Sequence, residues 1–137
     1  MKSPVTHLFD TNIVSYVMKR SVPGLAERFY SLPKLSRVIS AITEAELHYG
    51  LAKTPLAINA RNLVTQLLTE ITVVAWDSSA ALAFGKLRAA QEKIGRPIHT
   101  LDLQIAAHAL ALGAILVTRD RVFHDIPGLA CEDWTQS

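Results

Sequence analysis

The chain alternates short apolar runs with longer segments of helical periodicity, and this alternation restricts its fold more than any other feature. Runs of strand length and composition lie at residues 5–9, 37–42, 71–75 and 114–117. Between them, apolar residues recur at the spacing of one helix face. Strands that are apolar throughout are buried on both faces, which is typical of parallel sheets covered by helices. The sequence therefore predicts an α/β fold, a three-layer α/β/α sandwich with a small, mostly parallel sheet.

The predicted helices fill the intervals between these strands. We expect them at residues 12–19, 25–32, 43–53 and 55–69, then from a cap at Asp77 to Gly95 and from a cap at Thr100 to Gly113, with a short edge strand at 129–131. A length of 137 residues without a repeat or linker indicates a single domain over residues 1–137. No apolar run approaches the roughly 18 residues that span a bilayer, and the start lacks the features of a signal peptide. We expect a cytoplasmic protein without a membrane segment.

The composition excludes several kinds of chemistry. A formal net charge of +2 permits a nucleic-acid partner without requiring one, because phosphate affinity depends on clustered Lys and Arg. The single cysteine, Cys131, cannot form an internal disulfide or a thiolate metal cluster. The five histidines show no metal-ligand spacing, which disfavours a zinc site.

Four isolated acids each lie where an apolar run stops, at Asp10, Glu46, Asp102 and Asp120. Asp10 and Asp120 directly follow predicted strands, and Glu46 follows the second strand after a few residues. Asp102 lies in the first turn of an apolar helix. In open parallel sheets, ligands bind at the carboxyl ends of the strands, near a switch in strand order. We therefore expect all four acids at one edge of the sheet.

Two of these acids also have a simple capping explanation when each is considered alone. Asp10 could cap the helix that follows it, because Asp and Asn are favoured at that position. Thr43 and Glu46 have the spacing of a capping box, in which the Glu side chain reaches back to the Thr43 amide.

The other two acids have electrostatic alternatives. Asp102 is favoured near a helix N-terminus by the helix dipole, and Asp120 could form ion pairs with the flanking Arg119 and Arg121. Taken together, however, carboxylates converging in apolar surroundings need a cation, since unpaired buried charges are costly. Oxygen ligands of this kind suit a hard divalent ion such as Mg²⁺.

Longer motifs around the acids resemble those of a known family. They are Phe-Asp-Thr-Asn at 9–12, Ile-Ser-Ala-Ile-Thr-Glu-Ala-Glu-Leu-His-Tyr-Gly at 39–50, Gly-Arg-Pro-Ile-His-Thr-Leu-Asp-Leu-Gln-Ile-Ala-Ala-His-Ala at 95–109 and Leu-Val-Thr-Arg-Asp at 116–120. In order and spacing the chain resembles the PIN-domain ribonucleases, specifically the VapC-type toxins of toxin–antitoxin pairs. The similarity extends over nearly the whole chain.

The resemblance assigns roles to the acids. It implies that Asp10 and Asp102 are the principal ligands of Mg²⁺, for which Mn²⁺ substitutes, and that Glu46 acts directly or through a bound water. The fourth position is often Asn in close relatives and is Asp120 here. That change keeps an oxygen ligand, and it leaves open whether Asp120 binds metal or only orients water.

Residues beside the acids receive supporting roles. The resemblance implies that Thr11, Asn12 and Thr118 donate or accept hydrogen bonds around the site. Arg119 and Arg121 bracket an acid of the site, so we predict that they contact the phosphates of RNA.

The function implied by the resemblance is that of a metal-dependent endoribonuclease toxin that inhibits translation. A tRNA is the expected substrate, with the anticodon loop of initiator tRNA as the leading candidate, because single-stranded loops expose their bases. The expected partners are a VapB-type antitoxin, in a hetero-oligomer, and a second copy of the chain, in a homodimer.

Three alternatives use similar patterns. A haloacid-dehalogenase-type phosphatase needs a second acid two residues after the first, where this chain has Asn12. A phosphoacceptor receiver domain needs paired acids after the first strand, which are absent. A PIN fold that binds RNA or a partner without cutting it remains the open alternative, although the presence of all four acids favours an enzyme.

Overall fold

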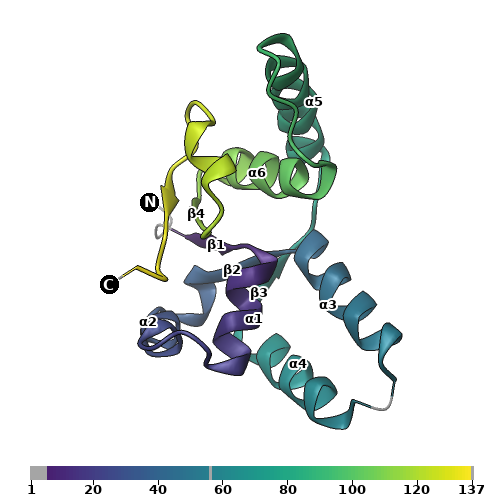
Figure 1. The fold of residues 1–137 in the computed structure, drawn as a ribbon, viewed down its shortest axis with the longest axis vertical. Coiled ribbons are helices and arrows are strands. Elements are labelled where there is room, and N and C mark those ends of the chain that lie inside the picture. Colours follow the sequence, from purple (N-terminus) through teal and green to yellow (C-terminus); the bar gives the residue numbers. More distant parts are fainter. Residues whose placement is uncertain (1–5, 56, 137) are drawn as a thin grey trace.

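The computed structural model describes residues 6–55 and 57–136, so position 5 of the first predicted strand and Leu56 lie outside the described residues. The strands are β1 (His7–Phe9), β2 (Arg37–Ser40), β3 (Thr72–Val74), β4 (Ile115–Val117) and β5 (Cys131–Glu132). The α-helices are α1 (Thr11–Lys19), α2 (Leu25–Ser31), α3 (Ala41–Lys53), α4 (Ile58–Glu70), α5 (Ser78–Lys93) and α6 (Thr100–Leu112), with short 3₁₀ helices at Lys34–Ser36 and Arg121–Asp125. Figure 1 shows their arrangement.

All five strands are parallel and lie in the order β3-β2-β1-β4-β5. The chain builds the sheet outward from β1, first through β2 to β3 and then through β4 to β5. The carboxyl end of β1 is therefore the point at which the strand order reverses, where open α/β sheets bind ligands. Asp10 follows β1 directly and its amide donates to the Val117 carbonyl of β4, at 3.2 Å.

Alternate residues of the central strands face opposite layers, as the strand period of two requires. One apolar cluster contains Phe9, Ile39 and Val117 with buried residues of α1, α2, α3 and α4. The other contains their neighbours Leu8, Val38 and Leu116 with residues of α5 and α6. The sheet is thus covered on both faces, which confirms the predicted α/β/α architecture.

Three predicted helix starts are wrong. The third helix begins at Ala41, because the Ser40 hydroxyl accepts from the Ile42 amide at 3.0 Å and caps the helix three residues before Thr43. The fourth begins at Ile58, beyond the turn at Pro55. His99 rather than Thr100 occupies the cap position of α6. The cap at Asp77 is confirmed, since its carboxylate accepts from the Ala80 amide at 3.2 Å.

The buried helix α6 is apolar on nearly every side, as predicted. Five of its apolar residues are buried, namely Leu103, Ile105, Ala106, Ala107 and Ala109, whereas Leu112 at its C-terminal end is exposed. It is nevertheless short, and within the described ranges no helix has the length and apolar character needed to cross a membrane.

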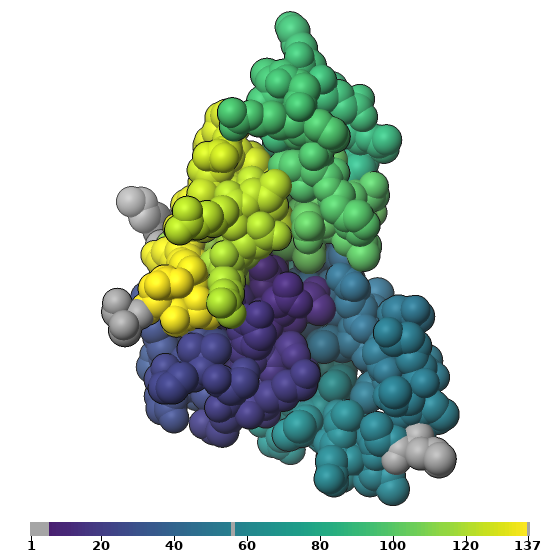
Figure 2. Space-filling model, in the orientation of Figure 1, coloured from purple at the N-terminus to yellow at the C-terminus, as the bar shows by residue number. Residues whose placement is uncertain are grey.

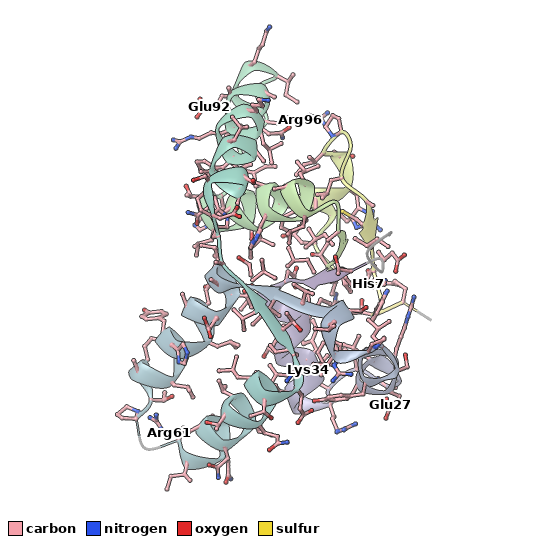
Figure 3. The ribbon with its side chains drawn as sticks, turned by 180° about the vertical axis from the view of Figure 1, so that it is seen from behind. His7, Glu27, Lys34, Arg61, Glu92 and Arg96 are labelled. Atoms are coloured by element: carbon pink, nitrogen blue, oxygen red, sulfur yellow. The ribbon has the colours of Figure 1, made fainter. Side chains whose placement is uncertain are left out.

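Peripheral elements extend from this core at opposite ends. Helix α5 projects on one side and the α3–α4 pair on the other (Figure 1). The labelled Glu92 on α5 and Arg61 on α4 mark the two ends in the reverse view (Figure 3).

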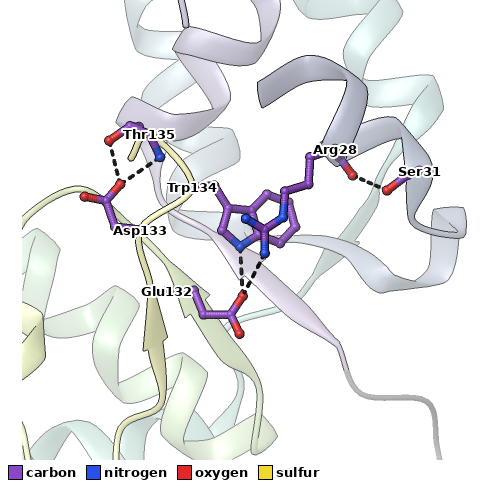
Figure 4. Close-up of polar contacts among 6 residues, drawn as sticks. All are labelled: Arg28, Ser31, Glu132, Asp133, Trp134 and Thr135. Atoms are coloured by element: carbon purple, nitrogen blue, oxygen red, sulfur yellow. Dashed lines mark hydrogen bonds and ion pairs between the residues drawn. The ribbon is translucent and has the colours of Figure 1, made fainter. Parts of the chain in front are cut away.

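The C-terminal segment is fixed to α2 through a stacked tryptophan (Figure 4). The Arg28 guanidinium lies over the Trp134 ring, 4.1 Å from its centroid. The indole Nε1–H donates to Glu132 at 2.8 Å, and Glu132 also pairs with Arg28 at 3.7 Å. These contacts hold β5 at the edge of the sheet, next to β4.

Candidate active site

A small pocket opens at the carboxyl end of β1. It has a volume of about 110 Å³ and is lined by Asp10, Thr11, Asn12, Glu46, Asp102 and Ile105. Three of the four predicted acids therefore meet, although Asp10 lies between β1 and α1, Glu46 lies in α3 and Asp102 lies in α6. Figure 2 shows the N-terminal part of the chain, in purple, at the surface between the C-terminal segment and α3. Asn12, which lines the pocket, is exposed.

Asp10 is the most buried of these acids, with 6% of its surface exposed. It caps α1, because Oδ1 accepts from the Ile13 amide at 2.9 Å. Its other oxygen, Oδ2, accepts from the Thr118 hydroxyl at 2.5 Å. Capping was the simple alternative for Asp10, and the structure shows that it accounts for only one of the two oxygens.

Thr118 joins Asp10 to Asp120. The Thr118 side chain is fully buried, and its Oγ1 accepts from the Asp120 amide at 3.1 Å while donating to Asp10. Thr118, which follows β4, thus holds the side chain of Asp10, which follows β1. This contact agrees with the hydrogen-bonding role predicted for Thr118.

Glu46 lies in the second turn of α3, and its capping-box explanation is wrong because the helix is capped by Ser40. Its carboxylate is instead approached from α1. The Thr11 hydroxyl lies 3.4 Å from Glu46 Oε1 and 3.2 Å from the hydroxyl of Thr43, which is fully buried. One hydroxyl carries one proton, so Thr11 can donate to either the Thr43 hydroxyl or the Glu46 carboxylate, and it links the two residues. Sequence reasoning treated Thr43 only as a cap and missed this role.

The acids perturb one another. Burial raises the pKa of Asp10, and the charges of Asp102 and Asp120 raise it further. The hydrogen bonds that Asp10 accepts from the Thr118 hydroxyl and the Ile13 amide oppose this rise only in part. Burial also raises the pKa of Asp102, and the charges of Asp120 and Glu46 add to this effect while His99 opposes it. Clustered acids with raised pKa values are typical of functional sites.

Asp120 stands apart from the other three acids. It is exposed, does not line the pocket, and caps the 3₁₀ helix that follows by accepting from the Val122 amide at 3.0 Å. Among residues 6–55 and 57–136, no ion pair to Asp120 is formed, so the pairing with Arg119 or Arg121 is not observed. Its charge nevertheless acts on both Asp10 and Asp102.

A wider depression lies beside the two arginines that flank Asp120 in the sequence. It has a volume of about 610 Å³ and is lined by Arg119, Arg121, His124, Asp125, Asp133 and Gln136. Burial alone would raise the pKa of Asp133. The hydrogen bonds that Asp133 accepts from Thr135, together with the charge of Arg119, outweigh burial and leave this pKa below its usual value. Figure 4 shows Thr135 against Asp133. The two predicted RNA-contacting arginines therefore share one exposed surface.

The donor set fits a hard cation. Mg²⁺ is usually held by one or two carboxylates together with several waters. In the described part of the chain, no group of three or more Asp, Glu, His or Cys side chains is arranged closely enough to hold a metal ion by itself. Asp10, Glu46 and Asp102 line one pocket, in which, beyond the effect of burial, the charge of Asp102 raises the pKa of Asp10 and the charge of Glu46 raises the pKa of Asp102. This arrangement suits a partly hydrated ion and excludes a thiolate or histidine cage.

Sequence comparison decides the family. The PIN domain family profile matches residues 8–129, which include all four acids. This chain belongs to the PIN domain family. Within it, the chain belongs with the VapC-type ribonucleases, the toxin members of toxin–antitoxin pairs.

Curated relatives of this PIN domain match over almost its full length. The "tRNA(fMet)-specific endonuclease VapC" of Shigella flexneri is 34% identical and the match covers 93% of this chain and 97% of the relative. "Ribonuclease VapC1" of Haemophilus influenzae is 37% identical, with 95% and 98% of the two chains covered.

Solved structures show the same PIN fold. The DNA-bound VapBC of Salmonella typhimurium is similar with a TM-score of 0.87 and 32% identity, over 96% of this chain and 99% of that one. VapBC2 of Rickettsia felis, bound to a promoter DNA fragment, gives a TM-score of 0.87 at 30% identity, over 95% and 99% of the two chains. The three-layer architecture is therefore that of known VapC-type PIN domains.

Replacing Asp102 by Asn is expected to raise the thermal unfolding midpoint of the metal-free PIN domain at pH 7. The pKa of Asp102 is higher in the folded chain than in the unfolded one, so ionisation at neutral pH costs folding free energy. The gain should shrink as the pH falls through the raised pKa of the folded state and vanish below the unfolded value of 3.8, where the carboxyl is protonated in both states. Thermal scans in EDTA would measure it, with exposed Asp125→Asn as the control. A lower midpoint for Asp102→Asn at pH 7 would contradict the electrostatic account.

Proposed function

We propose that this chain is a metal-dependent endoribonuclease toxin that cuts tRNA, with the anticodon loop of initiator tRNA as the leading target. One observation carries the proposal. Asp10, Glu46 and Asp102 line one pocket at the switch point of a VapC-type PIN fold. Cleavage of initiator tRNA would inhibit translation.

Asp10 and Asp102 would hold Mg²⁺ or Mn²⁺, with Glu46 contributing directly or through water. When bound, such an ion lowers the pKa of water and stabilises charge on a phosphoryl group. The protein's own part is orientation. Thr118 fixes one oxygen of Asp10, and Thr11 lies against Glu46, so the carboxylates are held before substrate arrives.

The shape of the site supports an RNA backbone as substrate. The pocket is small and its rim is exposed at Asn12, which suits a phosphodiester drawn across the surface better than an enclosed small molecule. A single-stranded loop presents such a backbone with its bases splayed outward. The Shigella flexneri relative is named a tRNA(fMet)-specific endonuclease, which supports initiator tRNA as the proposed substrate of this chain.

Arg119 and Arg121 would contact phosphates beside the cut. Changing both to Gln is expected to weaken RNA binding about equally for all sequences and to reduce the slope of log affinity against log salt by about 0.7 for each lost contact. Fluorescence anisotropy with a labelled tRNA at several salt concentrations would measure this, in EDTA to prevent cleavage. Arg61→Gln, on the exposed end of α4, is the matched control. An unchanged slope in the double variant would place the RNA elsewhere.

Partners of the chain follow from the same assignment. The similar solved structures are VapBC complexes, two of them bound to DNA. We propose a VapB-type antitoxin that binds this chain in a hetero-oligomer and suppresses cleavage, and a homodimer of the toxin itself. Because tRNA is used in the cytoplasm, the proposed location is cytoplasmic.

The target can be tested with purified, antitoxin-free protein. Incubation with total tRNA and Mg²⁺, followed by sequencing of the new RNA ends, should give cuts concentrated in the anticodon loop of initiator tRNA. A mixture of elongator tRNAs serves as the internal comparison. Cuts spread evenly over all tRNAs would contradict the specificity while leaving the nuclease assignment intact.

A further inference from the structure

A buried hydrogen bond joins the two helices that carry Glu46 and Asp102. Ser40 ends β2 and caps α3, and none of its surface is exposed. His108 lies on α6 with 1% exposure, and its Nδ1 is 2.8 Å from the Ser40 hydroxyl oxygen. The two residues are 68 positions apart in the sequence, so only the tertiary fold brings them together.

The proton of this bond can be assigned from its surroundings. The Ser40 oxygen already accepts from the Ile42 amide at 3.0 Å, and its own proton needs an acceptor. Neutral His108 provides one at Nδ1 when its proton is on Nε2. Burial lowers the pKa of His108, with smaller opposing effects of Asp77 and the Ala75 carbonyl, so the ring is neutral at pH 7. The hydroxyl therefore donates to the ring.

The other ring nitrogen gives His108 little independent anchoring. Nε2 is buried and, within the described residues, makes no well-formed hydrogen bond. Among the described residues, the contact to Ser40 is therefore the well-formed hydrogen bond of this ring, and the Ala75 carbonyl interacts with it more weakly. Loss of the Ser40 contact would leave Nδ1 buried and unsatisfied.

The hydrogen bond lies at the same distance along the chain from each of the two acids. Glu46 lies six residues after Ser40, and Asp102 lies six residues before His108. At a rise of about 1.5 Å per residue, each carboxylate-bearing position is roughly 9 Å along its helix from the bond. A shift of α3 against α6 at this bond would change the separation of the two acids.

We infer that the Ser40–His108 hydrogen bond is a positioning element that sets the spacing of Glu46 and Asp102 and thereby tunes the affinity of the pocket for divalent cations. The inference rests on the proposed function, because it requires that the pocket bind such an ion. Neither residue touches the pocket, and their effect acts through the two helices.

Binding of Mn²⁺ alone tests the inference without RNA cleavage, through the electron paramagnetic resonance signal of the free ion. His108→Leu removes the acceptor, and His108→Asn keeps an oxygen near the position of Nδ1. We expect the Mn²⁺ dissociation constant to rise about 3- to 10-fold in His108→Leu, less than for groups that touch a metal ligand. The Mn²⁺ dissociation constant of His108→Asn should remain within about twofold of that of the unchanged protein. This result is expected if the hydrogen bond, and not the volume of the ring, sets the affinity.

Two further variants separate positioning from stability. Ser40→Ala removes the donor with a small change in volume and should weaken Mn²⁺ binding as much as His108→Leu does. The variant that carries both changes should bind Mn²⁺ no more weakly than the single variant with the lower affinity. Leu67→Ala, in the opposite core cluster, should destabilise the fold without changing Mn²⁺ affinity.

The outcomes that would overturn the inference are distinct from those that would overturn the function. Unchanged Mn²⁺ affinity in folded Ser40→Ala and His108→Leu would remove the positioning role, as would an equal loss in His108→Asn and His108→Leu. Absence of Mn²⁺ binding by the unchanged protein would overturn the proposed metal site itself.

Discussion

Replacing Asp10 by Asn is expected to lower the rate of metal-dependent RNA cleavage by at least about 100-fold. Changing groups that only orient metal ligands lowers metal affinity or activity roughly 10- to 100-fold, so loss of a principal ligand should lower activity by at least the upper value. Asp10 is 6% exposed, lies at the switch point of the sheet, and is held through both oxygens. Asn keeps the size and the helix cap, so the effect isolates the charge.

Asp77 offers a matched control for this change. It is also an aspartate that caps a helix through its carboxylate, but it lies at the start of α5 and not in the pocket. Asp77→Asn should therefore leave cleavage within about twofold. Initial rates on total tRNA with Mg²⁺ would compare the two variants, and equal activity of Asp10→Asn and the unchanged protein would refute the site assignment.

Truncation of Phe29 to Ala is expected to destabilise the fold by about 3–5 kcal/mol, the cost typical of deleting a buried aromatic ring. Phe29 is fully buried on α2, with its ring centroid 4.8 Å from that of Phe9 and 5.0 Å from that of Tyr30. It therefore joins α2 to the strand that leads into Asp10. A large part of a small domain's total stability depends on such a contact.

Urea unfolding followed by circular dichroism would measure the free energy of unfolding of this variant. Leu35→Ala is the control, because Leu35 is 72% exposed and its loss should change stability by no more than about 0.5 kcal/mol. A loss below about 1 kcal/mol for Phe29→Ala would mean that the aromatic cluster is not the packing centre that it forms in the structure.

The parts of the fold that could be predicted are those governed by local pattern and sheet geometry. The apolar runs around Leu8, Val38 and Leu116 predict buried parallel strands, and parallel strands place their carboxyl ends on one edge. Asp10 directly follows β1, and Asp102 lies in the first turn of a helix too apolar to be exposed. Their meeting in one pocket follows from these two facts.

Other parts of the site depend on single-residue choices that a pattern cannot resolve. Ser40 and Thr43 are both good helix caps, and the choice of Ser40 frees Thr43 to contact Thr11. Asp120 was expected beside the other acids; it is exposed and caps a 3₁₀ helix without lining the pocket, although its charge acts on Asp10 and Asp102. The Ser40–His108 contact joins two segments whose separation only tertiary packing determines.

The most direct test of the central claim is cleavage of total tRNA by the antitoxin-free protein with Mg²⁺ or Mn²⁺, with EDTA, and with EDTA followed by excess metal. The proposed function predicts cleavage with metal, none with EDTA, and recovery when metal is restored. Equal cleavage in EDTA would contradict metal dependence. No cleavage under any condition by folded protein would favour a PIN domain that binds RNA or a partner without cutting.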